Sequence, residues 1–82
     1  MTKMERVKNI YLNEVKHGQF IRLEDGNCYC VVKRGQDYKL IPIVLSEVKT
    51  VNQYSINQPK ILCIFKENGD CIKVLDKEVE DD

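Results

Sequence analysis

Two turn sequences, Asp25-Gly26 and Asn68-Gly69, constrain the fold of this 82-residue chain more than any other feature. Both dipeptides supply the positive φ angles that tight hairpin turns require, and each lies between two runs rich in apolar residues. A third reversal is predicted at residues 34–37, which read Arg-Gly-Gln-Asp. The sequence therefore predicts antiparallel strands over residues 19–23, 28–33, 38–45, 61–66 and 71–75.

Two other segments are open to more than one interpretation. Residues 2–5 have the form of a helix capping box, and apolar residues follow at helical spacing. Residues 7–12 fit a first strand as well, and we favour the strand because this segment is rich in mediocre helix formers. Residues 46–60 are polar and predict a long connection, with a short strand or a single helical turn near Val48 and Val51 as alternatives.

Five to six short strands with hairpin turns predict a mainly β fold, a small antiparallel barrel or roll with a short N-terminal helix as an open alternative. The length allows one domain, predicted over residues 1–75, and an acidic disordered tail over residues 76–82. The tail holds five acids and one lysine, so the rest of the chain carries twelve basic and eight acidic residues. The net charge of zero is therefore unevenly distributed, with residues 1–75 positive and residues 76–82 negative.

No run of apolar residues approaches the roughly 20 that a membrane helix needs. The N-terminus also lacks the apolar region and cleavage site of a secretory signal. We therefore expect a cytoplasmic protein that does not enter a membrane.

The turn geometry also predicts which side chains face the core. A two-residue loop at Asp25-Gly26 pairs Leu23 with Cys28 and Ile21 with Cys30. The predicted core face of this hairpin comprises Ile21, Leu23, Cys28, Cys30 and Val32. The predicted opposite face comprises Phe20, Arg22, Tyr29, Val31 and Lys33. In the second hairpin the predicted core residues are Ile61, Cys63, Phe65, Ile72 and Val74, with Cys71 on the other side.

The four cysteines and the single histidine do not have a known metal-binding spacing. Cys28-x-Cys30 and Cys63-x7-Cys71 differ from the paired knuckles of structural zinc sites, and His17 lies apart from them. The chain also lacks nucleotide-binding and nucleophile motifs, and its size leaves little room for a closed pocket. We expect a non-enzymatic protein without metal, cofactor or small-molecule substrate.

Two surfaces are candidates for binding a macromolecule. The third strand has more apolar residues than one face of a small core needs, which predicts an edge strand that binds a protein partner or a second copy. The residues of this set are Tyr38, Leu40, Ile41, Ile43 and Val44. A central strand covered on both faces is the alternative.

The second surface interleaves aromatic rings with cations on the predicted face opposite the core. Rings that stack bases and cations that neutralise phosphates are typical of small barrels that bind single-stranded nucleic acid. This set comprises Phe20, Arg22, Tyr29, Lys33 and Lys39.

Residues 15–26, Val-Lys-His-Gly-Gln-Phe-Ile-Arg-Leu-Glu-Asp-Gly, resemble the entry to small SH3-like β-barrels, where a turn leads into a strand and a hairpin. This resemblance implies a fold and leaves the function open. The size, the Lys-, Asn- and Ile-rich composition and the acidic tail are similar to those of small accessory proteins of phages and mobile elements. We expect a binding module that acts through a protein–protein interface, with binding of single-stranded nucleic acid as the alternative.

Overall fold

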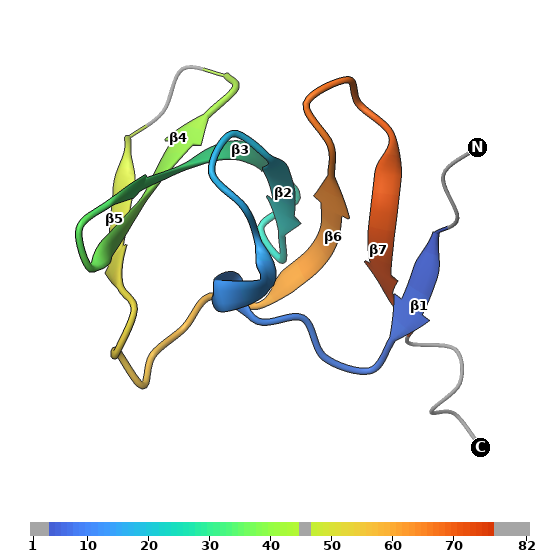
Figure 1. Ribbon diagram of the computed structural model, residues 1–82, viewed down its shortest axis with the longest axis horizontal. Coiled ribbons are helices and arrows are strands. Elements are labelled where there is room, and N and C mark those ends of the chain that lie inside the picture. The colour runs from blue at the N-terminus through green and yellow to red at the C-terminus, as the bar shows by residue number, and fades with distance from the viewer. Residues whose placement is uncertain (1–3, 45–46, 77–82) are drawn as a thin grey trace.

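A computed structural model of the chain describes residues 4–44 and 47–76. These residues form a mainly β fold, as predicted, with one short 3-10 helix and one seven-stranded sheet (Figure 1). The elements are β1 (Glu5–Val7), η1 (Leu12–Glu14), β2 (Phe20–Leu23), β3 (Cys28–Arg34), β4 (Asp37–Pro42), β5 (Lys49–Asn52), β6 (Ile61–Phe65) and β7 (Cys71–Leu75). Of the predicted tail, residues 77–82 lie outside the described part.

The strands follow the order β1-β7-β6-β2-β3-β4-β5. Every neighbouring pair is antiparallel except β1 and β7, which run parallel, so the sheet is mixed. β1 and β5 form the two ends of this order and do not pair with each other in the described structure. The sheet is therefore open, and it has seven strands where five to six were predicted.

The N-terminal segment forms a strand only at Glu5–Val7, and the predicted strand over residues 7–12 gives way to a crossing and the η1 turn. This segment runs along the inner side of the curved sheet, where η1 lies between the two halves of the sheet (Figure 1). The reason is burial, because Ile10, Leu12 and Val15 all enter the core.

The core consists of inner-face side chains of the sheet together with this N-terminal segment. Its buried members are Ile10, Leu12, Val15, Ile21, Leu23, Tyr29, Val31, Tyr38, Leu40, Ile61 and Ile64. Tyr29 is only 1% exposed, and its hydroxyl donates a hydrogen bond of 2.7 Å to Asp25 Oδ2. The bond satisfies the one polar atom that the buried ring carries.

The first hairpin has a three-residue loop, Glu24-Asp25-Gly26, where a two-residue loop was predicted. Leu23 N–H donates to Asn27 O at 3.1 Å, and Gly26 N–H donates to Leu23 O at 2.9 Å. Gly26 has a φ of +86°, which is the left-handed conformation that such a loop needs at its last position.

The extra loop residue shifts the register by one and overturns the predicted faces. Ile21 lies opposite Tyr29, and Arg22 lies opposite Cys28. Since successive residues of a strand point to opposite faces, a shift of one residue turns every side chain of β3 over. Tyr29 and Val31 therefore enter the core, while the predicted core residues Cys28, Cys30 and Val32 lie on the other face.

The second hairpin also has a three-residue loop, at residues 67–69, because Lys66 N–H donates to Asp70 O at 2.8 Å. Cys63 lies opposite Val74 as predicted, but Phe65 lies opposite Cys71 where Ile72 was predicted. The register shifts at Arg22/Leu23 in the β2–β6 pairing and at Ile64/Phe65 in the β6–β7 pairing. Because such an irregularity breaks the strict alternation of faces, Ile61 and Ile64 can both be buried in the core. The predicted core positions of Cys63, Phe65 and Val74 are therefore wrong.

β4 is not the edge strand that was predicted. Residues 37–40 pair with β3 on one side and with β5 on the other. Residues 46–60 were predicted as a long connection, and the short strand that was its alternative near Val48 and Val51 forms as β5, which supplies this second neighbour. Beyond Leu40, β4 pairs with β3 alone and ends at Pro42, which has no N–H to donate.

Candidate functional site

The face of the sheet that points away from the core is largely apolar, and we call it the outer face. Its membership follows from the register, because directly opposite residues of neighbouring strands share a face. Its central part comprises Phe20, Arg22, Cys28, Cys30, Val32, Lys39, Ile41, Ile43, Cys63, Phe65, Cys71 and Val74. Ten of these twelve side chains are apolar, which makes this face the strongest candidate for a binding surface.

One row of side chains crosses the outer face without any charge, and we call it the phenylalanine row. Phe20 is the central residue, with Cys30 opposite it on β3 and Phe65 opposite it on β6. Ile41 extends the row on β4, and Cys71 extends it on β7. Five neighbouring strands thus contribute one continuous apolar strip.

The neighbouring row, which we call the arginine row, has a cation at its centre. Arg22 lies between Cys28 on β3 and Cys63 on β6. Val74 continues the row on β7. Ile43 continues it on the other side, because the Ile43 N–H donates to the Cys28 carbonyl oxygen at 3.1 Å. Arg22 is therefore surrounded by apolar neighbours, and the next cation of the row is Arg6 on β1, which lies opposite Val74.

A shallow hollow of about 340 Å³ lies on this face, and its wall is mostly apolar. The lining residues are Phe20, Cys28, Ile43, Phe65, Glu67, Asn68 and Gly69. Both phenylalanines are half-buried, whereas Ile41 is 41% and Ile43 is 61% exposed. The hollow is open enough to receive an apolar side chain from another molecule.

The charges beside the hollow have no partner of opposite sign within residues 4–44 and 47–76. Arg22 is exposed and forms no ion pair with a carboxylate of these residues. Glu67 is exposed as well and has no cationic partner there. Arg22 and Glu67 therefore lie on or beside the apolar surface with opposite charges and without an ion-pair partner among these residues.

The thiols on this face lie close enough to influence each other. Burial raises the pKa of Cys63, the neighbouring Cys71 thiol raises it further, and the Arg22 guanidinium opposes both. Cys71 lies opposite Phe65, which shares the outer face with Cys63, so the prediction that Cys63 and Cys71 point to opposite sides of the sheet is wrong. Within the described residues no group of His, Cys, Asp or Glu side chains has the arrangement to hold a metal ion.

The predicted edge-strand set is divided by the structure. Tyr38 and Leu40 are core residues and cannot contact a partner. Ile41 and Ile43 lie on the outer face, and Val44, just past the end of β4, is exposed. Two of the five predicted residues therefore fill the core, and the other three are exposed.

The predicted nucleic-acid set is divided as well. Phe20, Arg22 and Lys39 lie on the outer face, where Lys39 Nζ donates to Thr50 Oγ1 at 3.2 Å. Tyr29 is buried, so its ring cannot stack on a base. Lys33 lies on the other face, with its ammonium 5.4 Å from the centre of the Tyr38 ring.

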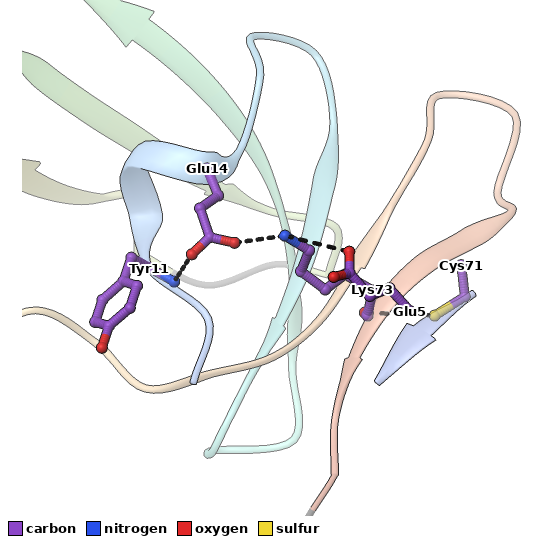
Figure 2. A network of polar contacts seen from close by, with 5 residues as sticks. All are labelled: Glu5, Tyr11, Glu14, Cys71 and Lys73. Atoms are coloured by element: carbon purple, nitrogen blue, oxygen red, sulfur yellow. Dashed lines mark hydrogen bonds and ion pairs between the residues drawn. The ribbon is translucent and has the colours of Figure 1, made fainter. Parts of the chain in front are cut away.

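A polar network of Glu5, Glu14 and Lys73 on the inner face has a structural role (Figure 2). Lys73 Nζ lies 2.6 Å from Glu14 Oε1 and 3.8 Å from Glu5 Oε1. Glu14 also accepts the N–H of Tyr11 at 3.2 Å, so it caps η1 while it binds the lysine. The hydrogen bond to Glu14 raises the pKa of Lys73 despite partial burial. The network thereby connects β7 to η1 and β1.

His17 is also held in a structural arrangement. Its Nδ1 accepts the backbone N–H of Lys33 at 3.1 Å, which links the turn before β2 to β3. An open hollow of about 370 Å³ lies beside it, lined by Lys16, Gln19 and the second hairpin loop. Its lining mixes cations with Glu67 and does not suggest one particular ligand.

The sequence interpretation missed the gathering of all four cysteines and both phenylalanines on one face. The signal was present in the first loop, since Glu24, Asp25 and Gly26 together fit a three-residue turn with glycine last. That choice alone puts Cys28 and Cys30 outward.

Among the described residues, no helix is long and apolar enough to cross a membrane. The chain has no significant match to a known protein family, to a curated protein or to a solved structure.

Proposed function

We propose that the protein is a non-enzymatic binding module that acts through a protein–protein interface on its outer face. The observation that supports this proposal is the uninterrupted phenylalanine row beside an apolar hollow on an exposed surface. Exposed apolar strips of this kind are typical of surfaces that another protein covers. An accessory protein of the phage or mobile-element type remains our proposal for its class.

Side-chain packing, and not the addition of a strand, is the mode of binding that the geometry favours. The part of β4 that lacks a β5 neighbour begins after Leu40 and contains Pro42. Proline removes the backbone donor that an added strand would use. The phenylalanine row and the hollow offer apolar contact area instead, with Arg22 as a polar anchor for an acidic group of the partner.

Binding of single-stranded nucleic acid is the weaker alternative. Of its five predicted residues, only Phe20, Arg22 and Lys39 share a face, and they are separated by uncharged side chains. A strip with one central cation neutralises few phosphates, so it would bind a polyanion weakly.

Two further expectations are kept as proposals. An SH3-like relationship is the first, and the five neighbouring antiparallel strands β6-β2-β3-β4-β5, with β7 and β1 added at one end, support it. All four cysteines are free thiols, which favours a reducing compartment such as the cytoplasm.

The proposed function is tested by affinity capture from an extract of the source cells. The protein and two matched variants serve as bait, Ile41→Ser on the phenylalanine row and Ile56→Ser in the loop after β5. Ile56 is 93% exposed and does not belong to the outer face, so both variants replace an exposed isoleucine by serine. We expect a stoichiometric protein that the wild type and Ile56→Ser retain and Ile41→Ser loses.

Native thiols provide a second measurement of the same contact. A bound partner covers Cys28, Cys30 and Cys63, so it slows their alkylation by a maleimide, measured by mass spectrometry. Capture that Ile41→Ser leaves intact, or thiols that react equally fast with and without the captured protein, would contradict the proposal. Binding to labelled oligonucleotides that weakens with salt and with Arg22→Ala would favour the nucleic-acid alternative.

A further inference from the structure

We propose that one partner of the outer face is a second copy of this chain, packed face to face about a two-fold axis. This inference rests on the proposed function, because it identifies the molecule that covers the same surface. A two-fold interface requires self-complementarity, since each contact between residue i and residue j occurs twice. The charges and the apolar rows of the outer face meet that requirement.

The charge pattern provides the first part of this complementarity. Arg22 lies on one side of Phe20 and Glu67 lies on the other, and neither has an ion-pair partner among the described residues. The Glu67 carboxylate lies beside Gly18, because a Cβ atom at Gly18 would lie 2.9 Å from Glu67 Oε2. The carboxylate is therefore level with residue 18 of the chain.

Phe20 lies between these two charges along the strand direction. Gly18 N–H donates to Val31 O, one residue from Cys30, whereas Arg22 lies opposite Cys28, two residues from Cys30 on the other side. Gly18 and Arg22 are therefore about 3 Å and about 7 Å from the phenylalanine row, on opposite sides of it. Consider a two-fold axis that lies between the outer faces of the two copies and crosses β2 at right angles at Phe20. This axis reverses the order of Arg22, Phe20 and Glu67 in the second copy. Arg22 of each copy then faces Glu67 of the other, which forms two identical ion pairs.

The same axis runs along the phenylalanine row, so Phe20, Phe65, Cys30 and Ile41 each lie opposite the same residue of the second copy. This row therefore packs apolar groups on apolar groups, whereas Ile43 lies opposite Lys39 of the second copy on β4. On β3, Cys28 and Val32 lie two residues on either side of Cys30. The axis therefore places Cys28 of one copy opposite Val32 of the other. Packed sheets lie about 10 Å apart, a distance that facing side chains of this size fill.

Two properties of the whole chain favour self-association. A domain of 82 residues has a small core, so burial of an apolar face against a second copy adds stability that the monomer lacks. The net charge is zero, so two copies do not repel each other as a whole.

The test is a charge exchange in the purified full chain, followed by sedimentation equilibrium or light scattering across a range of concentrations. Arg22→Glu alone places two acids together at each contact, and Glu67→Arg alone places two cations together. We expect each single variant to raise the dimer Kd by about tenfold or more. An equimolar mixture of the two variants restores both ion pairs, so we expect it to form a heterodimer with an affinity close to that of the wild type.

The mixture distinguishes loss of dimerisation through charge repulsion from loss through misfolding, because two misfolded variants would not dimerise with each other. Both side chains are exposed, and the melting temperatures of the variants verify that they fold. A wild type that stays monomeric at high concentration, or a mixture that associates no better than its components, would overturn the inference. In that case capture of another protein by the same face would still support the proposed function.

Discussion

The ion pair between Lys73 and Glu14 gives the sharpest prediction about stability. Lys73 Nζ lies 2.6 Å from Glu14 Oε1, and the two side chains are 23% and 29% exposed. A hydrogen bond to a charged group contributes about 1.5 to 3 kcal/mol when well buried, whereas an exposed ion pair contributes about 0 to 1. Partial exposure places this pair between the two classes, so we expect a coupling free energy of about 1 kcal/mol.

The structure supplies its own control for this measurement. Glu5 Oε1 lies 3.8 Å from the same ammonium, and the Glu5 side chain is 64% exposed. Its coupling to Lys73 is therefore expected to stay below about 0.5 kcal/mol. The comparison keeps the lysine constant and changes only the distance and the exposure of the carboxylate.

The assay is a pair of double-mutant cycles by urea unfolding at pH 7, with Lys73→Met, Glu14→Gln and Glu5→Gln. Glutamine preserves the acceptor for the Tyr11 N–H, so the cycle isolates the charged contact to Lys73. Because the folded state raises the pKa of Lys73 above its ordinary 10.5, the contribution is fully present below that pH and is lost as the pH rises past the raised value. Equal coupling to Glu14 and Glu5, or a coupling to Glu14 below about 0.3 kcal/mol, would refute the assigned role of the network.

Three further predictions concern the first hairpin and the thiols. The backbone N–H of Asn27 and then the Tyr29 hydroxyl hold the pKa of Asp25 below its ordinary 3.8, and Tyr29→Phe removes the second of these hydrogen bonds. The stability that depends on ionised Asp25 is present above pH 3.8 and lost as the pH falls through the lowered value, so the difference between variant and wild type in thermal melts is expected to shrink in acid. Gly26→Ala forces an alanine into a φ of +86° and is expected to lower the free energy of unfolding in urea by about 1 to 2 kcal/mol. Gly26→Asn is expected to lower it by less, and equal losses for the two variants would contradict the loop geometry. In the native protein all four cysteines are expected to react with a maleimide at pH 8, and Cys63 is expected to react slowest because its pKa is raised. If Cys28 and Cys30 react only after unfolding, their assignment to the outer face is wrong.

The candidate site could be predicted only in part from the sequence. Phe20, Arg22, Ile41 and Ile43 were singled out, but as members of two separate surfaces. The structure joins them because β4, β3 and β2 are consecutive neighbours, so residues from both sets lie in the same two rows. The tyrosine that was expected to bind a ligand, Tyr29, fills the core instead.

The sequence by itself determined the hairpins, because turn chemistry is local. Gly26, Gly35 and Gly69 all adopt positive φ at the predicted reversals, and the apolar runs between them form the expected strands. It also determined that the fold is mainly β and that β4 contains more apolar side chains than one face of a sheet requires.

Tertiary structure alone decided the register, the position of β4 and the role of the N-terminal segment. Loops of two and three residues are close in local energy, so burial of the whole face selects between them, and a ring as large as Tyr29 gains more from the core than a cysteine does. β4 became a central strand because the next segment of the chain, the polar Lys49–Asn52, forms a strand and pairs with it. These choices depend on tertiary contacts that local turn chemistry does not specify, and the outer face with its four thiols is their result.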